Sequence, residues 1–247
     1  MFKNKIKTLL GLNMGNSSLQ RPEPKINAYS RQLSPDQIAS REHRNMVGGF
    51  WQEIGSLQFE FLKNRGLLPQ HKFIDIGCGA MRGGLYFVRY LDKGNYFGID
   101  SNTSLIEAGK FELDAAGLSN KLPNLLINQK FELSLFEMKF DYALALSVFT
   151  HLYMNHIMRC LVEVNSVLKT GGQFYATFFE SPSPGFPSPI HHNSGDITTY
   201  YDRDPFHYSF SEMEILAAAA KLEVELIDTW VHPRNQKMLC FTKTRFE

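Results

Sequence analysis

The segment FIDIGCGAMRGGL, residues 73–85, constrains the fold most, because it joins an apolar strand to a helix through a glycine-rich turn. Gly77 and Gly79 lack Cβ, so the turn can adopt positive φ and let a ligand approach the main chain. A second apolar segment, YFGID, also ends in an acid, Asp100, roughly 20 residues beyond the turn. In an α/β sheet this pair places a ligand-cradling turn beside a carboxylate that can accept both ribose hydroxyls. The sequence therefore predicts an adenosine site.

The spacing of the glycines separates two classes of adenosine cofactor. A dinucleotide fingerprint reads G-x-G-x-x-G, because the third glycine lets the helix pack closely while its N-terminus faces a pyrophosphate. Here Gly83 comes one place late. An NAD-dependent oxidoreductase is therefore the less favoured alternative.

The rest of the chain alternates strand and helix patterns, as expected for a doubly wound sheet. The last two strands are joined by only a few residues, so they must pair antiparallel. The predicted strands after the first two cover residues 125–127, 142–146, 172–180, 224–230 and 237–242. The predicted helices begin near residues 35, 50, 82, 102, 154 and 211, with capping boxes at Ser34–Gln37, Ser104–Glu107 and Ser211–Glu214.

Four motifs in this order resemble those of class I S-adenosylmethionine-dependent methyltransferases. They are Ile74–Gly79, Asp100, FDYALALS at 140–147 and LKTGGQFYATFFE at 168–180, and the resemblance covers roughly residues 48–247. It implies a Rossmann-like, doubly wound, mostly parallel seven-stranded sheet with a C-terminal antiparallel hairpin, an enzyme of the EC 2.1.1 type, and S-adenosyl-L-methionine as the cofactor. The late antiparallel hairpin, which a dehydrogenase lacks, also favours the methyl donor.

The resemblance also implies roles for individual residues. Asp75 and the glycine main chain would hold the methionine end of the donor, Asp100 the ribose and Ser147 the donor's flank. Asn128 and Phe131 match the adenine position, the first by hydrogen bonding and the second by stacking. The predicted cofactor-binding residues are Asp75, Gly77, Cys78, Gly79, Asp100, Asn128, Phe131 and Ser147.

A general base is needed if the methyl acceptor is a hydroxyl. The candidates are His151, Glu180 and His207, with His191 and His192 also open. His151 follows the fourth strand, where the switch-point rule for open sheets places the ligand. A histidine that only hydrogen-bonds the backbone at a helix start explains His151 equally well. No cysteine and histidine spacing fits zinc, so no metal is expected.

The domain organisation follows from local composition. Residues 1–33 are predicted to form an arm with a short helix and a linker, and residues 34–247 the methyltransferase domain. Within that domain, residues 34–66 supply covering helices. Residues 181–210 are too long and aromatic for an ordinary connection, so they are interpreted as a substrate-binding insert.

Charge and cysteine content limit the partners. The chain of 247 residues has 26 Lys and Arg against 25 Asp and Glu, and it lacks an N/D-P-P-Y/F segment, so no nucleic-acid substrate is expected. Three widely spaced cysteines indicate reduced thiols and a cytoplasmic location, and no apolar run suits stable membrane insertion. We expect a small-molecule acceptor, most simply a hydroxyl of a sugar or specialised metabolite, and a homodimer is compatible with the sequence. The alternative function is a non-catalytic cofactor-binding or protein-interaction module on the same fold.

Overall fold

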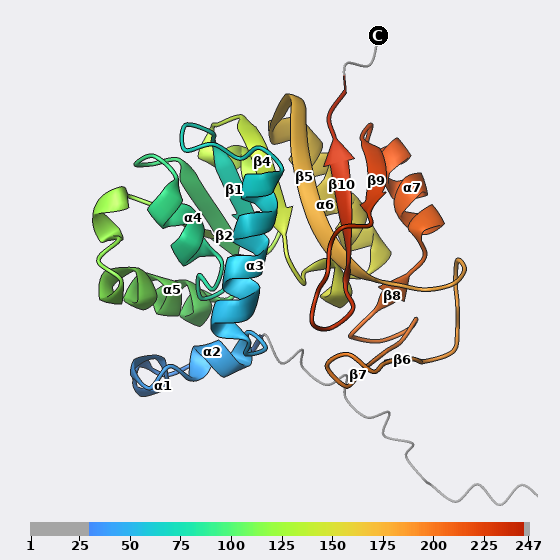
Figure 1. Cartoon of the computed structure of the whole chain (residues 1–247), viewed down its shortest axis with the longest axis horizontal. Coiled ribbons are helices and arrows are strands. Elements are labelled where there is room, and N and C mark those ends of the chain that lie inside the picture. The colour runs from blue at the N-terminus through green and yellow to red at the C-terminus, as the bar shows by residue number, and fades with distance from the viewer. Residues whose placement is uncertain (1–29, 245–247) are drawn as a thin grey trace, which may run out of the picture.

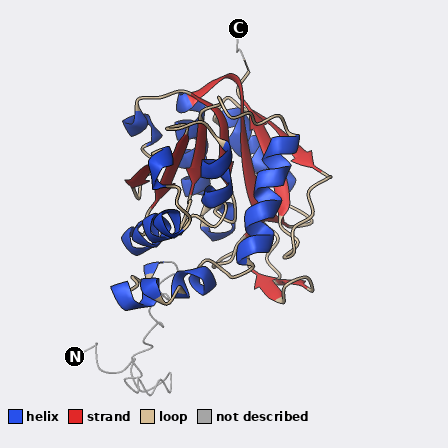
Figure 2. Ribbon diagram, turned by 60° about the vertical axis from the view of Figure 1, so that its left-hand side comes forward, coloured by secondary structure: helices blue, strands red, loops and turns tan. Residues whose placement is uncertain are grey.

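A computed structural model describes residues 30–244 and shows a central sheet with helices on both of its faces (Figures 1 and 2). The strand order is β3-β2-β1-β4-β5-β10-β9, parallel from β3 to β5, while β10 is antiparallel to both β5 and β9. This confirms the predicted doubly wound sheet with a C-terminal antiparallel hairpin. The bounds are β1 (Phe73–Ile76), β2 (Tyr96–Asp100), β3 (Asn124–Ile127), β4 (Phe140–Ala145), β5 (Leu168–Glu180), β9 (Glu223–Ile227) and β10 (Lys237–Thr242).

Burial on both faces explains why the parallel strands are so apolar. Ile74 and Ile76 of β1 pack in one hydrophobic cluster with residues of α6 (Met154–Val167) and α7 (Phe210–Ala219). Phe73 points to the other face, where it packs with residues of α3 (Trp51–Asn64), α4 (Gly84–Tyr90) and α5 (Thr103–Ala115). The period-two alternation of β1 therefore assigns one helical layer to each face.

The segment before α3 differs from its prediction. Ser34 and Gln37 form the predicted capping box, but the single helix expected to reach Met46 is two short helices, α1 (Pro35–Ala39) and α2 (Glu42–Met46). Arg41 between them is left-handed, with φ of 63°, which ends the first helix. Of the predicted arm, only residues 30–33 fall within the described residues; there Leu33 is buried and its N–H donates to Ser104 Oγ at 2.9 Å.

Two other predicted helix caps are wrong by two residues. The side chain of Asn102, rather than that of Ser104, caps α5 by accepting the Leu105 N–H at 3.2 Å. Ser209 forms the capping box of α7 with Glu212, two residues before the predicted pair. The helix after the glycine turn begins at Gly84 rather than Arg82, because Met81 still has φ of 68°.

The insert, residues 181–210, is more regular than predicted. It contains an antiparallel hairpin, β6 (Ile190–His192) with β7 (Ile197–Thr199), and a short strand, β8 (His207–Tyr208). Because β8 pairs parallel with the end of β5, the sheet gains an eighth strand beyond the seven predicted. Three short 3₁₀ helices, Ser119–Lys121, Leu133–Phe136 and Phe149–His151, complete the described elements.

Figure 1 shows α1, α2 and the insert at the same edge of the sheet, the edge where β1, β2, β4 and β5 end. The topology thus brings the covering helices, the glycine turn and the insert to one rim. Among residues 30–244, no helix has the length and apolar character needed to cross a membrane.

Candidate functional site

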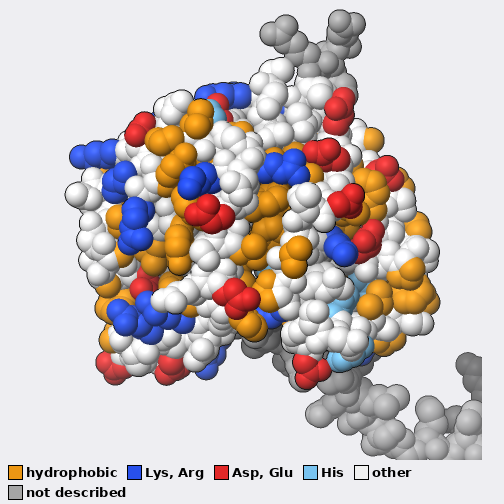
Figure 3. Space-filling model, in the orientation of Figure 1, with side chains coloured by type: hydrophobic (Ala, Val, Ile, Leu, Met, Phe, Trp, Pro, Cys, Tyr) orange, Lys and Arg blue, Asp and Glu red, His pale blue; other side chains and the backbone are white. Residues whose placement is uncertain are grey.

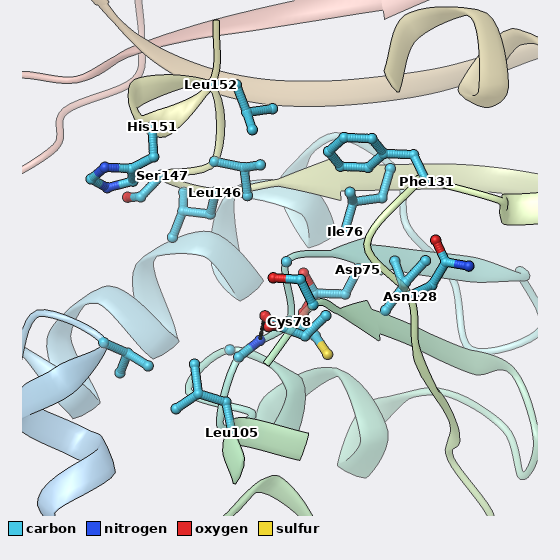
Figure 4. A pocket seen from close by; sticks show the side chains of 18 of the residues that line it. Asp75, Ile76, Cys78, Leu105, Asn128, Phe131, Leu146, Ser147, His151 and Leu152 are labelled. Atoms are coloured by element: carbon cyan, nitrogen blue, oxygen red, sulfur yellow. Dashed lines mark hydrogen bonds between the residues drawn. The ribbon is translucent and has the colours of Figure 1, made fainter. Parts of the chain in front are cut away.

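A cavity of about 330 Å³ opens at the carboxyl ends of β1, β2 and β4. Every cofactor-binding residue predicted from the sequence lines it, and so does His151. Figure 4 shows Asn128 and Phe131 at one end of this pocket, Ser147 and His151 at the other, and Asp75 between them. The structure therefore brings together in one pocket residues that are up to 76 positions apart in the chain, from Asp75 to His151.

The glycine turn has the geometry that its sequence predicts. Gly77 and Gly79 have φ of 72° and 53°, and the N–H groups of Gly77 and Cys78 both donate to Ile99 O, at 2.7 and 3.1 Å. A Cβ added to Gly77 would lie 2.5 Å from Val148 Cγ2. The turn is thus held against β2. Its main chain also approaches the Val148 side chain, in the loop after β4, at a distance that only glycine permits.

We expect Gly77→Ala to destabilise the protein by roughly 2–4 kcal/mol, because it adds backbone strain to a steric clash. The matched control is Gly117→Ala, where φ is also positive, at 67°, but a Cβ would meet nothing within 4 Å. The control should show only the backbone cost, about 1–2 kcal/mol. Equal losses for the two variants in urea unfolding would show that the close approach to Val148 contributes nothing.

The carboxylate of Asp100 holds the turn. Its Oδ2 accepts the Gly79 N–H at 2.9 Å and its Oδ1 accepts the Asn102 N–H at 2.8 Å. Burial raises the pKa of Asp100, while the backbone N–H groups around it act in the opposite direction. Each carboxylate oxygen has a second lone pair, so Asp100 can still accept hydrogen bonds from a ligand hydroxyl.

Asp75 is a buried acid on the floor of the pocket. The Tyr96 hydroxyl donates to its Oδ2 at 2.8 Å, and the residue is only 4% exposed. Burial raises the pKa of Asp75 to about 7, with Asp100 adding to the rise and Tyr96 and Arg82 opposing it. A cationic ligand beside Asp75 would favour the ionised form.

The pH dependence of ligand binding follows from this pKa. Because the folded pKa lies above the usual value of a carboxyl, the neutral form dominates below pH 7 and the charge appears as pH rises through 7. A ligand with an ammonium group, such as S-adenosylhomocysteine, should therefore bind about tenfold more tightly at pH 8 than at pH 6. Calorimetric titration across this range should show the change in wild type and a flat profile in Asp75→Asn; the same slope in both proteins would assign it to another group.

At the opposite end, Ser147 and His151 follow β4. Ser147 has φ of 58°; its N–H donates to Thr177 Oγ1 at 2.7 Å and its hydroxyl to Gln236 Oε1 at 2.9 Å. His151 Nδ1 is in hydrogen-bond contact with Asp204 Oδ1 of the insert. The side chain of His151 lines the pocket and is 22% exposed, while that of Asp204 is 32% exposed and contacts His151 from outside the lining.

The predicted adenine end is shaped by a loop rather than by free polar groups. Asn128 Oδ1 accepts the N–H groups of Lys130 and Glu132, at 2.8 and 3.2 Å, and its Nδ2 donates to Glu132 Oε2 at 2.7 Å. Phe131 is left-handed, with φ of 56°, and its ring lines the pocket. In the described structure Asn128 mainly holds the loop that presents Phe131.

Two predicted base candidates are not brought to the pocket. Glu180 ends β5 and pairs with Tyr208 of β8. His207 is fully buried, with Nδ1 3.0 Å from Thr199 Oγ1 and Nε2 3.0 Å from Phe186 O. His192 contacts the same hydroxyl, with its Nε2 3.1 Å from Thr199 Oγ1. Burial lowers the pKa of His192. These contacts hold the insert together instead of facing the cavity.

His191 does not line the pocket either, and its side chain is 53% exposed. Figure 3 shows histidine side chains on the lower part of the molecule, in the region of the insert. Of the histidines predicted as bases, His151 is therefore the one that reaches the cavity. Within residues 30–244, no group of three or more His, Cys, Asp or Glu side chains is arranged to hold a metal ion.

Arg82, Gln58 and Val47 line the pocket without having been predicted. Gln58 and Arg82 are 3% and 9% exposed, and Gly83 lies so close to Gln58 that an added Cβ would be 2.2 Å from its Cδ. The sequence feature that corresponds to this contact is Gly83, the third glycine of the turn, which comes one place too late for a pyrophosphate-binding fingerprint. Gly83 lies where Gln58 of α3 packs against the turn.

Comparison with known proteins agrees with this site. Residues 74–174 match the family model described as "Methyltransferase domain". That range spans the glycine turn, Asp100, Ser147 and His151. The match and the fold confirm the predicted resemblance to class I methyltransferases, and the match to the family model covers residues 74–174.

Solved structures share the whole fold at low sequence identity. The CcbJ methyltransferase from Streptomyces caelestis has a TM-score of 0.63 and 13% identity, covering 89% of this chain and 99% of that chain. An S-adenosylmethionine-dependent methyltransferase from Clostridium acetobutylicum ATCC 824 has a TM-score of 0.61 and 10% identity, covering 85% and 99%. Magnesium protoporphyrin IX methyltransferase from Synechocystis PCC 6803, with bound SAM, has a TM-score of 0.58 and 12% identity, covering 87% and 100%. The predicted cofactor is thus one that is found on this fold.

Proposed function

We propose that this protein is an S-adenosylmethionine-dependent methyltransferase that acts on a hydroxyl group of a small molecule. The observation that carries the proposal is that the glycine turn, the buried Asp75, the half-buried Asp100 and a histidine paired with a carboxylate meet at one pocket. The acids lie at the floor, and His151 stands at the mouth. This arrangement suits a positively charged donor below a hydroxyl acceptor.

The residues present fit the donor. The main chain at Gly77 and Gly79 is a cradle that a Cβ would fill at Gly77, and Asp100 has acceptor capacity for the ribose hydroxyls beyond its two backbone bonds. Asp75 would pair with the α-ammonium group, because a buried carboxylate without a cation is costly. Phe131 would pack against adenine from the other end of the pocket.

When bound, the donor supplies an activated methyl group, and its sulfur leaves as a neutral thioether. Held by Asp75, Asp100 and the glycine turn, the donor would supply its methyl carbon to the acceptor oxygen, and the electron pair of the carbon–sulfur bond would stay on sulfur. The pocket therefore has to align three atoms and remove one proton.

His151 is the proposed proton acceptor. Its Nδ1–H donates to Asp204, so in the neutral ring Nε2 is the nitrogen that can take the hydroxyl proton. The Asp204 carboxylate would stabilise the imidazolium that results. Ser147, held by Thr177 and Gln236, fixes the backbone that leads into His151.

The insert, residues 181–210, is the proposed acceptor-binding segment, because its Asp204 contacts the pocket residue His151 and it lies at the same rim of the sheet. Cys78, Cys160 and Cys240 are buried and not in disulfides, which supports our proposal of a reducing, cytoplasmic compartment.

The test is transfer of a labelled methyl group from S-adenosylmethionine to a panel of acceptors. The panel should hold monosaccharides, phenols and small alcohols, each paired with its O-methyl ether, together with DNA and RNA. We expect label in at least one hydroxylated compound and none in its methyl ether. Label only in nucleic acid, or donor binding without any transfer, would contradict the proposed acceptor class or the proposed catalysis, respectively.

A further inference from the structure

Residues 47–50, between α2 and α3, form a loop over the donor end of the pocket. Val47 lines the cavity, and its Cγ1 would lie 3.4 Å from a Cβ on Gly79, so it packs directly on the glycine turn. Gly48, Gly49 and Phe50 all have positive φ, at 90°, 66° and 47°. The two glycines adopt this region without strain, whereas Phe50 carries a Cβ and pays a backbone cost there, which contacts from outside the loop must offset.

Two arginines from distant segments supply those contacts. Arg82 Nη1 donates to both Val47 O and Gly49 O, each at 2.9 Å. Arg234 Nη2 donates to Gly48 O, which lies between them in the chain. Three successive carbonyls of the covering loop are therefore held by guanidinium groups, one from the donor turn and one from the β9–β10 loop. Such charge-assisted bonds are stronger than neutral ones.

Arg234 is closely enclosed where it meets the loop. Its Cζ lies 5.0 Å from the centre of the Phe50 ring, and a Cβ on Gly48 would come within 2.7 Å of Nη1. A Cβ on Gly195, in the hairpin of the insert, would come within 2.7 Å of its Cγ. Glycines in the covering loop and in the insert thus leave room for this one side chain.

The β9–β10 loop that carries Arg234 is itself anchored to the acceptor end. Gln236 accepts hydrogen bonds from Ser147 and Thr177, and Asn235 Nδ2 lies 3.3 Å from His192 Nδ1. His232 Nδ1 accepts the Arg234 N–H at 3.2 Å. Burial and the two arginines lower the pKa of His232 to about 4, so this ring adds no third positive charge. The loop is a fixed support for Arg234.

From these contacts we infer that Arg234 is a positioning residue: by holding the Gly48 carbonyl, it keeps residues 47–50 closed over the donor and slows release of the donor product. The identity of the donor rests on the proposed function, whereas the contacts of Arg234 with residues 47–50 are independent of it. Arg82 holds the loop from within the donor turn, while Arg234 links it to Ser147 and the insert at the acceptor end.

The test combines hydrogen exchange with product release in Arg234→Ala and Arg234→Lys. In the free protein, the Gly48 and Gly49 amides, which donate to Asn45 O and Arg44 O, should exchange at least roughly tenfold faster in Arg234→Ala. Dissociation of S-adenosylhomocysteine, followed by stopped-flow fluorescence of the nearby Trp51, should accelerate by a similar factor. Arg234→Lys, which keeps one donor and the charge, should recover part of both effects.

The matched control is Arg65→Ala, because Arg65 also lies over an aromatic ring, that of Phe61, but follows the C-terminal end of α3, away from the covering loop and the pocket. It should leave the exchange of the Gly48 and Gly49 amides and the release rate unchanged. Unchanged exchange and release in a folded Arg234→Ala, or an Arg234→Lys no closer to wild type than Arg234→Ala, would overturn the inference. If wild type did not bind S-adenosylhomocysteine, the proposed function would fail, and the exchange comparison alone would decide whether Arg234 holds the loop.

Discussion

Asp100→Ala should weaken binding of S-adenosylmethionine by roughly 10²–10³-fold, because the variant loses two charge-assisted hydrogen bonds to the ribose hydroxyls. The structure adds a second effect. The Asp100 carboxylate also accepts the N–H groups of Gly79 and Asn102, so its loss should lower stability by roughly 1–3 kcal/mol. The sequence alone predicts only the first effect, with an intact fold.

Calorimetry and thermal melting separate these two effects. Asp100→Asn keeps one side-chain oxygen and should recover part of the stability but little of the affinity. Asp92→Ala removes an exposed carboxylate at the other end of β2 and should change neither quantity. Wild-type affinity in Asp100→Ala would place the ribose site elsewhere in the pocket.

His151→Gln should lower kcat by roughly 10²–10⁴-fold with the acceptor found in the transfer assay, because a positioned general base contributes about that much. Donor affinity should stay unchanged, since His151 lies at the end of the pocket opposite Asn128 and Phe131. Asp204→Asn should lower kcat less, because the base remains and only its orientation and charge partner are lost.

The matched control for His151 is His71→Gln. His71 precedes β1, at the edge of the sheet away from the pocket, where its Nδ1 accepts the Leu68 N–H at 3.1 Å. It should keep full activity. Full activity of His151→Gln across pH 6–9 would show that no histidine base at this position is needed, and would leave alignment of the acceptor as the main contribution of the pocket.

The donor half of the site could be predicted because its signals are local. Gly77 and Gly79 must follow a strand and precede a helix, and Asp100 must end the neighbouring strand, so parallel pairing alone brings them together. The strands β4 and β5 could be predicted for the same reason, because each is a local apolar run. The residues whose positions could be predicted are those that lie at the end of a predicted strand.

The contacts that surround the pocket could not be predicted, because they join residues that lie far apart in the sequence. Arg82 and Arg234 converge on residues 47–50 from two distant segments of the chain, and Asp204 reaches His151 from a 30-residue insert whose hairpin has no strong period. No spacing rule links such residues. Gly48 and Gly195 are the local signs of this close approach, because a Cβ on either would lie 2.7 Å from the Arg234 side chain.

The misplaced cap of α7 has a related cause. Ser209–Glu212 and Ser211–Glu214 both satisfy the S-x-x-E pattern, so the local sequence allows two helix starts. The structure selects the first, because Glu212 also accepts the Gly185 N–H at 3.0 Å and Ser209 follows directly from β8. Tertiary contacts decide between two equal local solutions.

Titration calorimetry of the purified protein with S-adenosylhomocysteine, S-adenosylmethionine and NAD tests the central claim most directly. We predict saturable one-to-one binding of the first two, each displacing the other, and no heat of binding for NAD, because the third glycine comes too late for a pyrophosphate. Binding of NAD, or absence of binding by both sulfur compounds to a folded protein, would contradict the account.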